Sequence, residues 1–416
     1  MSKIDPIYVG KDATSQMLQY VAAHGLNRFA LVADTNTYAA LGEHVEQALK
    51  AKGYEVHSIV LEGDHIHTDE HQIVQVLIRG PLGPCTFIAV GSGTITDITR
   101  FSSHRSGRAF IGMPTAPSVD GFTSIGAPII LAGVKTTIVC QPPLAVFADI
   151  DTLCNAPQEL VAAGFGDMIG KITSLADWNL GRLLWDEPYD TEIAARSRTA
   201  INNVMSRTDA IGNRSEEGVR ALMDALIESG LCMLDFGATR PASGAEHHAS
   251  HYWEMKRLRE GRDSMFHGAQ VGYALTLVAK QYARIRAIDR AELMNRLEAA
   301  TLPNRDTEIA NIRAGYGDMT PKIIEEQEPF LNLTEADYDR LKRKIADNWD
   351  TIQSIAATVP EASVIIDALR EVGGPADYEA LGLDADEVPL GFRFGHYLRN
   401  RFTVVKLSRI IDVPLD

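Results

Sequence analysis

The sequence predicts a two-part protein, with an α/β domain built on a Rossmann-like parallel sheet over residues 1–155 and an all-α domain over residues 156–416. Two observations predict this division. A chain of 416 residues exceeds what a single core usually covers. Short apolar runs alternate with helical patterns as far as about residue 155, and beyond it the β-like runs disappear.

Four short apolar runs in the first part predict strands. Helical patterns lie between them, and such alternation is typical of a parallel sheet with crossover helices. The four runs are RFALVAD (28–34), VHSIVLE (56–62), CTFIAVG (85–91) and RAFIGMP (108–114).

The second part carries apolar residues at spacings of three and four, which is the helical signature. No repeat of fixed period and no low-complexity linker interrupts this pattern. The segments expected to be helical are 157–185, 190–208, 215–236, 267–286 and 334–357.

Composition excludes several classes of protein. A net charge of −15 argues against nucleic acid or an anionic membrane as a general partner. No stretch approaches the roughly 18 apolar residues that a membrane span needs, and MSKIDPIYVG lacks the apolar core of a signal peptide. The four cysteines show no CxxC spacing, which fits reduced thiols. We therefore expect a cytoplasmic protein without membrane insertion.

A glycine-containing turn follows the strand CTFIAV and precedes a helical pattern. Glycines at such a turn let a pyrophosphate approach the backbone N–H groups and the positive end of the helix. Thr96 stands where the GxGxxG pattern has its third glycine, and a purely structural turn would also explain the motif. The candidate cofactor-binding residues here are Gly91, Ser92, Gly93, Thr94 and Ile95.

Asp34 ends the strand RFALVAD and has two interpretations. Its carboxylate is suited to accept hydrogen bonds from an adenosine ribose, and it would disfavour the 2′-phosphate of NADP. It is equally suited to cap a helix that begins at TNTYAALG.

The stretch MPTAPSVDGFTS (113–124) predicts a loop at the edge of the sheet, because prolines and glycine interrupt regular structure. Loops held by a rigid scaffold commonly carry binding residues, although a structural turn has the same composition. The polar side chains of interest are Thr115, Ser118, Asp120 and Ser124.

GAEHHASH (244–251) holds three of the 12 histidines of the chain. In a helix His247 and His251 share one face, and His248 is turned about 100° away. Asp167, His247 and His267 would supply one carboxylate and two imidazoles as ligands of a divalent metal, and no HExxH pattern is present. Taken singly each residue has a structural alternative, and Asp167 has a pairing partner in Lys171 one turn further on.

Two other histidine contexts favour ordinary structure. DHIHTDEH (64–71) is polar throughout and indicates a solvated loop. His396 lies among aromatic and basic residues and indicates a packed histidine. The alternative is an anion pocket built with Arg393, Arg399 or Arg401.

The motifs, taken in order, closely resemble the sn-glycerol-1-phosphate dehydrogenase family in its bacterial branch. That family belongs to the superfamily of dehydroquinate synthase, glycerol dehydrogenase and iron-containing alcohol dehydrogenases. The resemblance is clear over roughly residues 85–275 and returns at YLRNRFTV, whereas the first 80 residues and 290–390 match only in general character. The motifs are GSGTITDITRF, PTAPSVDGFTS, AAGFGDMIGK, SGAEHHASHYWEM and FHGAQVG.

The resemblance implies a dehydroquinate synthase-like fold that binds NAD or NADP and one divalent metal, zinc or nickel. It implies GSGTI on the cofactor pyrophosphate, and Asp167, His247 and His267 as metal ligands. It further implies Asp120 and His251 as substrate contacts, and Thr115, Ser118 and Ser124 as cofactor contacts.

The reaction implied is the reduction of dihydroxyacetone phosphate, a phosphorylated triose, by a homodimer or larger homo-oligomer. A metal acting as Lewis acid stabilises the developing alkoxide, and His251 is placed to relay the proton. Lys171, a further candidate catalytic residue, and Lys135 are candidates for holding the substrate phosphate. The alternatives are a glycerol dehydrogenase, a dehydroquinate synthase-like cyclase, and a metal- or nucleotide-binding regulator without turnover.

Overall fold

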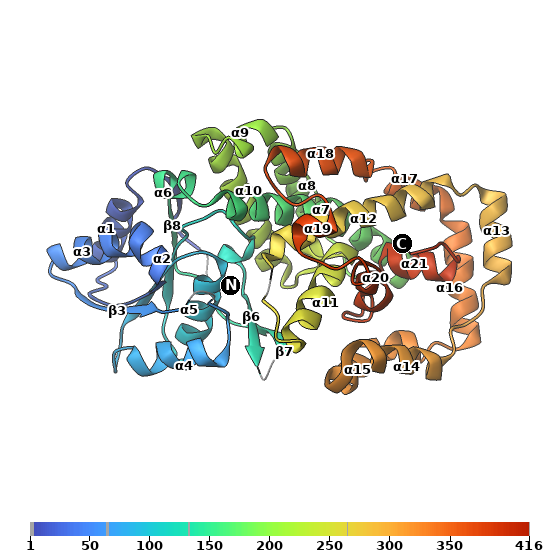
Figure 1. The fold of residues 1–416 in the computed structure, drawn as a ribbon, viewed down its shortest axis with the longest axis horizontal. Coiled ribbons are helices and arrows are strands. Elements are labelled where there is room, and N and C mark those ends of the chain that lie inside the picture. Colours follow the sequence, from blue (N-terminus) through green and yellow to red (C-terminus); the bar gives the residue numbers. More distant parts are fainter. Residues whose placement is uncertain (1–3, 64–65, 132–133, 264, 416) are drawn as a thin grey trace. The chain divides into compact units, whose positions relative to one another are not determined.

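The computed structural model describes residues 4–63, 66–131, 134–263 and 265–415. The chain forms two compact units, Met1–Met168 with Asn202–Gly237, and Ile169–Ile201 with Ala238–Asp416. All strands of the described residues belong to the first unit, and the second is helical (Figure 1). The predicted fold class, a parallel-sheet α/β part followed by a largely helical part, is confirmed.

The main sheet has six parallel strands in the order β1-β8-β5-β4-β2-β3. Four of them match the four apolar runs: β2 Arg28–Asp34, β3 Glu55–Leu61, β4 Thr86–Val90 and β5 Phe110–Met113. The other two, β1 Ile7–Gly10 and β8 Val146–Asp149, were not predicted, because they pair with each other from segments far apart in the chain.

Helices cover both faces of this sheet. One apolar cluster joins α1 (Ala13–Ala23) and α3 (Glu43–Ala51) to one face of β2, β4, β5 and β8. A second cluster joins α4 (Glu70–Arg79) and α5 (Gly93–Arg105) to the opposite face, as Figure 1 shows. Because strands covered on both faces are apolar throughout, they appear in the sequence as continuous apolar runs.

The strand order reverses direction at β2. This strand pairs with β3 on one side and with β4 on the other, so the chain crosses from one half of the sheet to the other between them. Ligands of open α/β sheets bind beyond the carboxyl ends of the strands at such a point. Asp34 ends β2 and Gly91 follows β4, so both candidate cofactor residues lie at this point.

A small antiparallel hairpin extends the first unit and was not predicted. Strands β6 (Gly126–Leu131) and β7 (Val134–Val139) pair with each other and pack through Ala127 and Ile129 against α4 and α5. Pro128 lies inside β6, and a proline in a short run argues against a strand in the sequence. An edge strand such as β6 nevertheless tolerates it.

The histidine-rich stretch 64–71 is a solvated loop only in part. Asp64 and His65 lie outside the described residues. The Asp69 carboxylate accepts the N–H of Gln72 at 2.9 Å and caps α4, so Glu70 and His71 already belong to that helix. This correction follows from the capping preference of aspartate.

The predicted long helices are present, with one break. They are α7 Gln158–Trp185, α8 Thr191–Met205, α10 Glu216–Phe236 and α12 His267–Ala287. The segment 334–357 is interrupted at Asn348 and forms α16 Glu335–Asp347 and α17 Trp349–Ala356.

Helix α10 belongs to the first unit although it follows residue 155. Its Val219, Met223 and Ile227 pack with Phe122 and Ile150 in one apolar cluster. The predicted boundary at residue 155 marks the change from strands to helices. The compact units are divided differently, because α10 packs with the α/β part. As a division of function, that boundary stays a prediction.

The remaining helices complete the two units. The first unit contains α2 Thr35–Thr37, α6 Ile150–Cys154 and α9 Thr208–Gly212. The second contains α11 Ala245–Arg259, α13 Arg290–Ala299, α14 Arg305–Tyr316, α15 Thr320–Leu331, α18 Ala362–Glu371, α19 Tyr378–Leu381, α20 Val388–Gly395 and α21 Val404–Ile410. Within the described ranges, no helix combines the length and apolar character that crossing a membrane requires.

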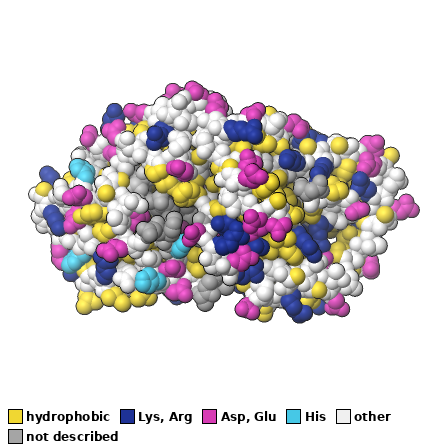
Figure 2. Space-filling model, in the orientation of Figure 1, with side chains coloured by type: hydrophobic (Ala, Val, Ile, Leu, Met, Phe, Trp, Pro, Cys, Tyr) yellow, Lys and Arg dark blue, Asp and Glu magenta, His cyan; other side chains and the backbone are white. Residues whose placement is uncertain are grey.

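An apolar strip lies on the outer face of α4. Val74, Leu77 and Ile78 are exposed there, followed by Leu82. Figure 2 shows apolar side chains along the lower left of the molecule, where Figure 1 places α4. Because contiguous exposed apolar side chains commonly mark contacts with other molecules, this strip is a candidate contact surface.

Candidate active site

The turn between β4 and α5 is shaped by close contacts. A Cβ on Gly91 would lie 2.6 Å from the Cβ of Ile95, and one on Gly93 would lie 2.8 Å from Cγ2 of Val119. Both positions therefore require glycine for steric reasons. The N-cap residue Ser92 makes no side-chain capping bond, so the first-turn N–H groups of α5 are not covered by that side chain. This is the arrangement that binds anions at helix N-termini.

The loop 113–124 lies along this turn. The N–H of Gly91 donates to the Met113 carbonyl at 3.2 Å, and the N–H of Thr115 donates back to the Gly91 carbonyl at 3.3 Å. Thr115 and Ser118 are buried, and the Ser124 hydroxyl donates to the Gly121 carbonyl at 3.2 Å. The predicted loop and the predicted turn thus form one structure, in which Ser124 has a structural hydrogen bond.

Arg100 ties α5 to the end of this loop and to the first residue of β6, and sequence reasoning did not identify it. Its wholly buried guanidinium donates to the carbonyls of Gly121 at 2.5 Å, Phe122 at 3.2 Å and Gly126 at 3.0 Å. It also donates to the Asp97 carboxylate at 2.6 Å. Burial raises the pKa of Asp97 to about 7, and the charge of Arg100 opposes that rise.

Asp34 serves as a helix cap. Its carboxylate accepts the N–H of Thr37 at 2.8 Å, and its own N–H donates to the Thr37 hydroxyl at 3.0 Å, which makes a capping box. Of the two interpretations of Asp34, the cap is therefore present in the structure. A contact with a ribose stays a prediction.

Asp120 and Asp167 are directly linked. The N–H of Asp120 donates to the Asp167 carboxylate at 3.0 Å, and the Asp120 carboxylate accepts the Ser229 hydroxyl at 2.9 Å. The loop reaches α7 so closely because residue 164 is glycine, since a Cβ there would lie 1.8 Å from the Pro117 carbonyl oxygen. The candidate substrate contact Asp120 thus lies next to a candidate metal ligand.

Three histidines form a cluster at the start of α11 and α12. His247 and His251 share one face of α11, as their spacing predicts, with ring centroids 6.1 Å apart. His267, the first residue of α12, lies 5.3 Å from the ring of His247 and 5.1 Å from that of His251. His248 is also buried, and its backbone carbonyl lies next to Gly395.

Asp167 completes a donor set that fits a divalent metal. It lies on α7, and Gly170, one turn further along that helix, packs next to His247. One carboxylate oxygen of Asp167 and one nitrogen each of His247 and His267 lie within 4.8 Å of one another. A carboxylate and two imidazoles are the protein ligands typical of catalytic sites that keep a position for substrate.

Two glutamates beside the histidines were missed from the sequence. Glu246 is wholly buried, and its carboxylate lies 2.8 Å from Nδ1 of His247. Burial works to raise the pKa of Glu246, but His247 and the hydroxyls of Ser174 and Thr173 hold it at about 2. Glu254 lies 3.6 Å from Nδ1 of His251. A glutamate in the first turn of a helix is common, because it interacts favourably with the helix dipole. The position of Glu246 in the sequence therefore does not reveal its contact with His247.

The two candidate phosphate lysines have different settings. Lys171 is wholly buried on α7, one turn after Asp167. Lys135 is half-buried on β7, where its charge acts to lower the pKa of Asp97. A contact of either lysine with a substrate phosphate stays a prediction.

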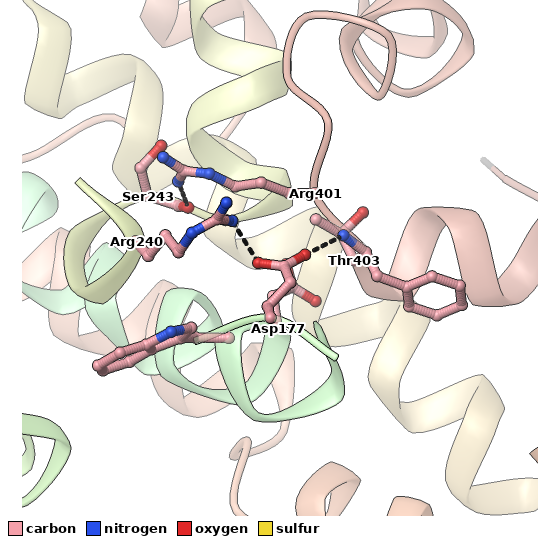
Figure 3. A pocket seen from close by; sticks show the side chains of 9 residues that line it. Asp177, Arg240, Ser243, Arg401 and Thr403 are labelled. Carbon is pink, nitrogen blue, oxygen red and sulfur yellow. Dashed lines mark hydrogen bonds and ion pairs between the residues drawn. The ribbon is translucent and has the colours of Figure 1, made fainter. Parts of the chain in front are cut away.

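A small pocket lies in the second unit at the start of α11. Arg401 donates there to the Ser243 carbonyl (Figure 3). Arg240 pairs with the Glu187 carboxylate. The Asp177 carboxylate accepts the N–H groups of Ala245 at 2.8 Å and Val404 at 2.7 Å. Because these groups pair with one another, their hydrogen bonds and ion pair stabilise the start of α11.

His396 is a packed histidine. It is buried, its ring lies 3.9 Å from that of Tyr397, and its Nε2 lies 3.2 Å from a guanidinium nitrogen of Arg409. Burial lowers the pKa of His396 well below its usual range, so the imidazole is neutral. The guanidinium beside this imidazole is that of Arg409, which was not among the three arginines considered from the sequence.

The fold is similar to that of the iron-containing alcohol dehydrogenases. The iron-containing alcohol dehydrogenase family model matches residues 8–157. A probable glycerol dehydrogenase from Sinorhizobium meliloti 1021 superposes with a TM-score of 0.62, covering 99% of this chain and 95% of that one at 14% identity. At that identity the likeness shows the fold.

By its sequence the chain belongs to the glycerol-1-phosphate dehydrogenase family. The glycerol-1-phosphate dehydrogenase (NAD(P)+) of Halalkalibacterium halodurans is 39% identical over 97% of this chain and 92% of its own length. The enzyme of the same name from Bacillus subtilis is 38% identical over 97% of this chain and 91% of its own. The resemblance of the motifs is thus confirmed.

Proposed function

We propose that the protein reduces dihydroxyacetone phosphate to sn-glycerol 1-phosphate with NADH or NADPH and one divalent metal ion, zinc or nickel. The family membership supports the activity. The observation that carries the mechanism is the group Asp167, His247 and His267, whose ligand atoms lie within 4.8 Å of one another.

The first unit supplies the cofactor half of this proposal. The first-turn N–H groups of α5 after Gly91 would hold the pyrophosphate, and Thr115 and Ser118 line the loop beside that turn. Because turn and loop are joined by two backbone hydrogen bonds, the binding surface exists before the cofactor arrives.

The second unit and Asp167 supply the substrate half. When bound, the metal ion supplies Lewis-acid stabilisation of the developing alkoxide and the nicotinamide supplies the hydride. His251 is partly exposed beside His267, and Glu254 lies 3.6 Å from its Nδ1. We assign to His251 the proton that the alkoxide must receive.

Metal-loaded protein is expected to oxidise NADH rapidly with dihydroxyacetone phosphate and at least about tenfold less efficiently with dihydroxyacetone, because a bound phosphate contributes charge-assisted hydrogen bonds. The measurement is kcat/KM for both ketones side by side, each with NADH and NADPH.

A chelated sample serves as the control and should lose activity with both substrates. A preference for dihydroxyacetone would instead assign a glycerol dehydrogenase. Failure to oxidise the cofactor with either ketone would contradict the proposed reaction and favour a cyclase or a regulator without turnover.

Replacing His251 with Ala is expected to lower kcat about 10²- to 10⁴-fold while leaving about one metal equivalent bound, because a proton relay acts on the reaction and does not hold the ion. Activity and metal content are measured on the same preparation. Loss of the metal would make His251 a ligand and overturn this assignment.

The remaining properties of the proposal follow from the family and from the surface. A cytoplasmic location agrees with the absence, in the described ranges, of a helix suited to span a membrane. The exposed apolar strip of Val74, Leu77, Ile78 and Leu82 offers a contact surface for the homodimer or larger homo-oligomer that we propose.

A further inference from the structure

Glu246 stands next to the candidate metal ligand His247 in the first turn of α11. Neither side chain has appreciable solvent contact, since Glu246 is 0% and His247 5% exposed. Oε1 of Glu246 lies 2.8 Å from Nδ1 of His247. An ionised carboxylate only accepts, so Nδ1 must carry the proton of this hydrogen bond, and Nε2 then carries the lone pair that binds a metal.

The carboxylate of Glu246 is itself fixed by three further donors. Oε1 accepts the N–H of Gly244 at 2.7 Å and the Ser174 hydroxyl at 2.5 Å, and Oε2 accepts the Thr173 hydroxyl at 2.6 Å. A hydroxyl or a backbone N–H carries no net charge, so these groups hold the anion without neutralising it. A divalent ion on the other nitrogen of His247 would bring a positive charge to the imidazole that the carboxylate faces.

Close helix packing makes this arrangement rigid. A Cβ on Gly170 would lie 2.4 Å from Cγ1 of Val271, so glycine is required where α7 meets α12. The same position contacts Cγ of Glu246 and Cε1 of His247, each at 3.7 Å. The absence of a side chain at residue 170 therefore brings the hydroxyls of Thr173 and Ser174 within reach of Glu246.

We propose that Glu246 is a positioning residue, which holds His247 in the tautomer and orientation that present Nε2 to the metal and strengthens that bond with its buried charge. Nothing in this role requires Glu246 to touch substrate or cofactor. The inference rests on the proposed function, because it takes His247 to be a metal ligand.

The test uses the full-length protein and Co²⁺ as the probe. Glu246→Gln keeps the shape of the side chain and removes its charge, so the Co²⁺ dissociation constant is expected to rise about 10- to 100-fold, with shifted visible absorption bands. Dissociation constants are measured by competition with a chromophoric chelator, and far-ultraviolet circular dichroism checks the fold. Thr173→Val is the matched control, since it removes the hydrogen bond to Oε2 but leaves the charge of Glu246 and every bond to Oε1, including that of His247. It should change the affinity less than about twofold.

Two further variants separate the possible failures. His247→Ala that still binds Co²⁺ as tightly as the unaltered protein would overturn the metal site and the proposed function with it. His247→Ala that loses Co²⁺, with Glu246→Gln unchanged in affinity and spectrum, would overturn only the role of Glu246. Should Glu246→Gln fail to fold, Glu246→Asp keeps the charge and tests the same point. A weakening for Glu246→Asp no greater than for Thr173→Val would then contradict a positioning role.

Discussion

Protein in which His267 is replaced with Ala is expected to retain less than a tenth of an equivalent of metal after dialysis and to lose about three orders of magnitude in kcat/KM, because the Lewis acid is lost with its ligand. His267 begins α12, and its ring centroid lies 5.3 Å from that of His247. Metal content by elemental analysis and turnover are measured on the same sample.

The matched control is His71→Ala. His71 is an exposed histidine on α4, within the other histidine-rich segment of the chain. Its replacement should leave metal content and activity unchanged. Equal losses in both variants would show that metal binds diffusely to histidines, and would contradict a site defined by Asp167, His247 and His267.

Asp167→Asn extends the same test to the carboxylate. The wholly buried Asp167 accepts the N–H of Asp120 at 3.0 Å, and an amide oxygen preserves that bond. If the charge of Asp167 serves the metal, the ion is lost although the loop stays in place. Retention of the full metal content would instead favour a structural role, such as the pairing with Lys171 considered from the sequence.

The parts of the site that were predicted correctly are those coded by local pattern. The run TFIAV followed by Gly91 and Gly93 shows a strand, a turn and a helix within about ten residues, and the structure contains all three. The four-residue spacing of His247 and His251 also predicts correctly that they share one face of α11, because residues four apart lie on neighbouring turns of a helix.

The parts that were missed depend on contacts between distant segments. Glu246 has its role through hydroxyls 72 and 73 residues away in the chain, and no local pattern links them. Arg100 donates to carbonyls 21 to 26 residues further on. Strands β1 and β8 were missed for a related reason, since β1 pairs with β8 from a distant part of the chain.

Arg100 carries the second large expected effect. Arg100→Met is expected to lower the free energy of unfolding of the first unit by about 3–5 kcal/mol, because it leaves a buried carboxylate without its charge partner. The guanidinium is 0% exposed and lies 2.6 Å from Asp97. The denaturant midpoint measures the loss, and the KM for NADH should rise, because Gly121 and Phe122 lose the donor that places the loop beside Gly91.

The double variant Arg100→Met with Asp97→Asn separates charge from packing. It removes both charges, so it should be more stable than Arg100→Met alone, while still lacking the three donors to the loop carbonyls. A double variant as unstable as Arg100→Met would assign the whole loss of stability to the missing hydrogen bonds to those carbonyls.

The pH dependence supplies an independent check on the same pair. Because burial raises the pKa of Asp97 to about 7, the folded state binds a proton that the unfolded chain has released above its ordinary pKa of 3.8. This group therefore makes stability fall as pH rises from about 4 to 7. Removing Arg100 takes away a charge that lowers this pKa, so in Arg100→Met the fall in stability should continue above pH 7.

Replacing Asp97 with Asn abolishes the titration. If the carboxylate is the cause, the double variant should therefore exceed Arg100→Met in free energy of unfolding by an amount that grows between pH 5 and 8. An advantage independent of pH would assign the difference between the two variants to packing.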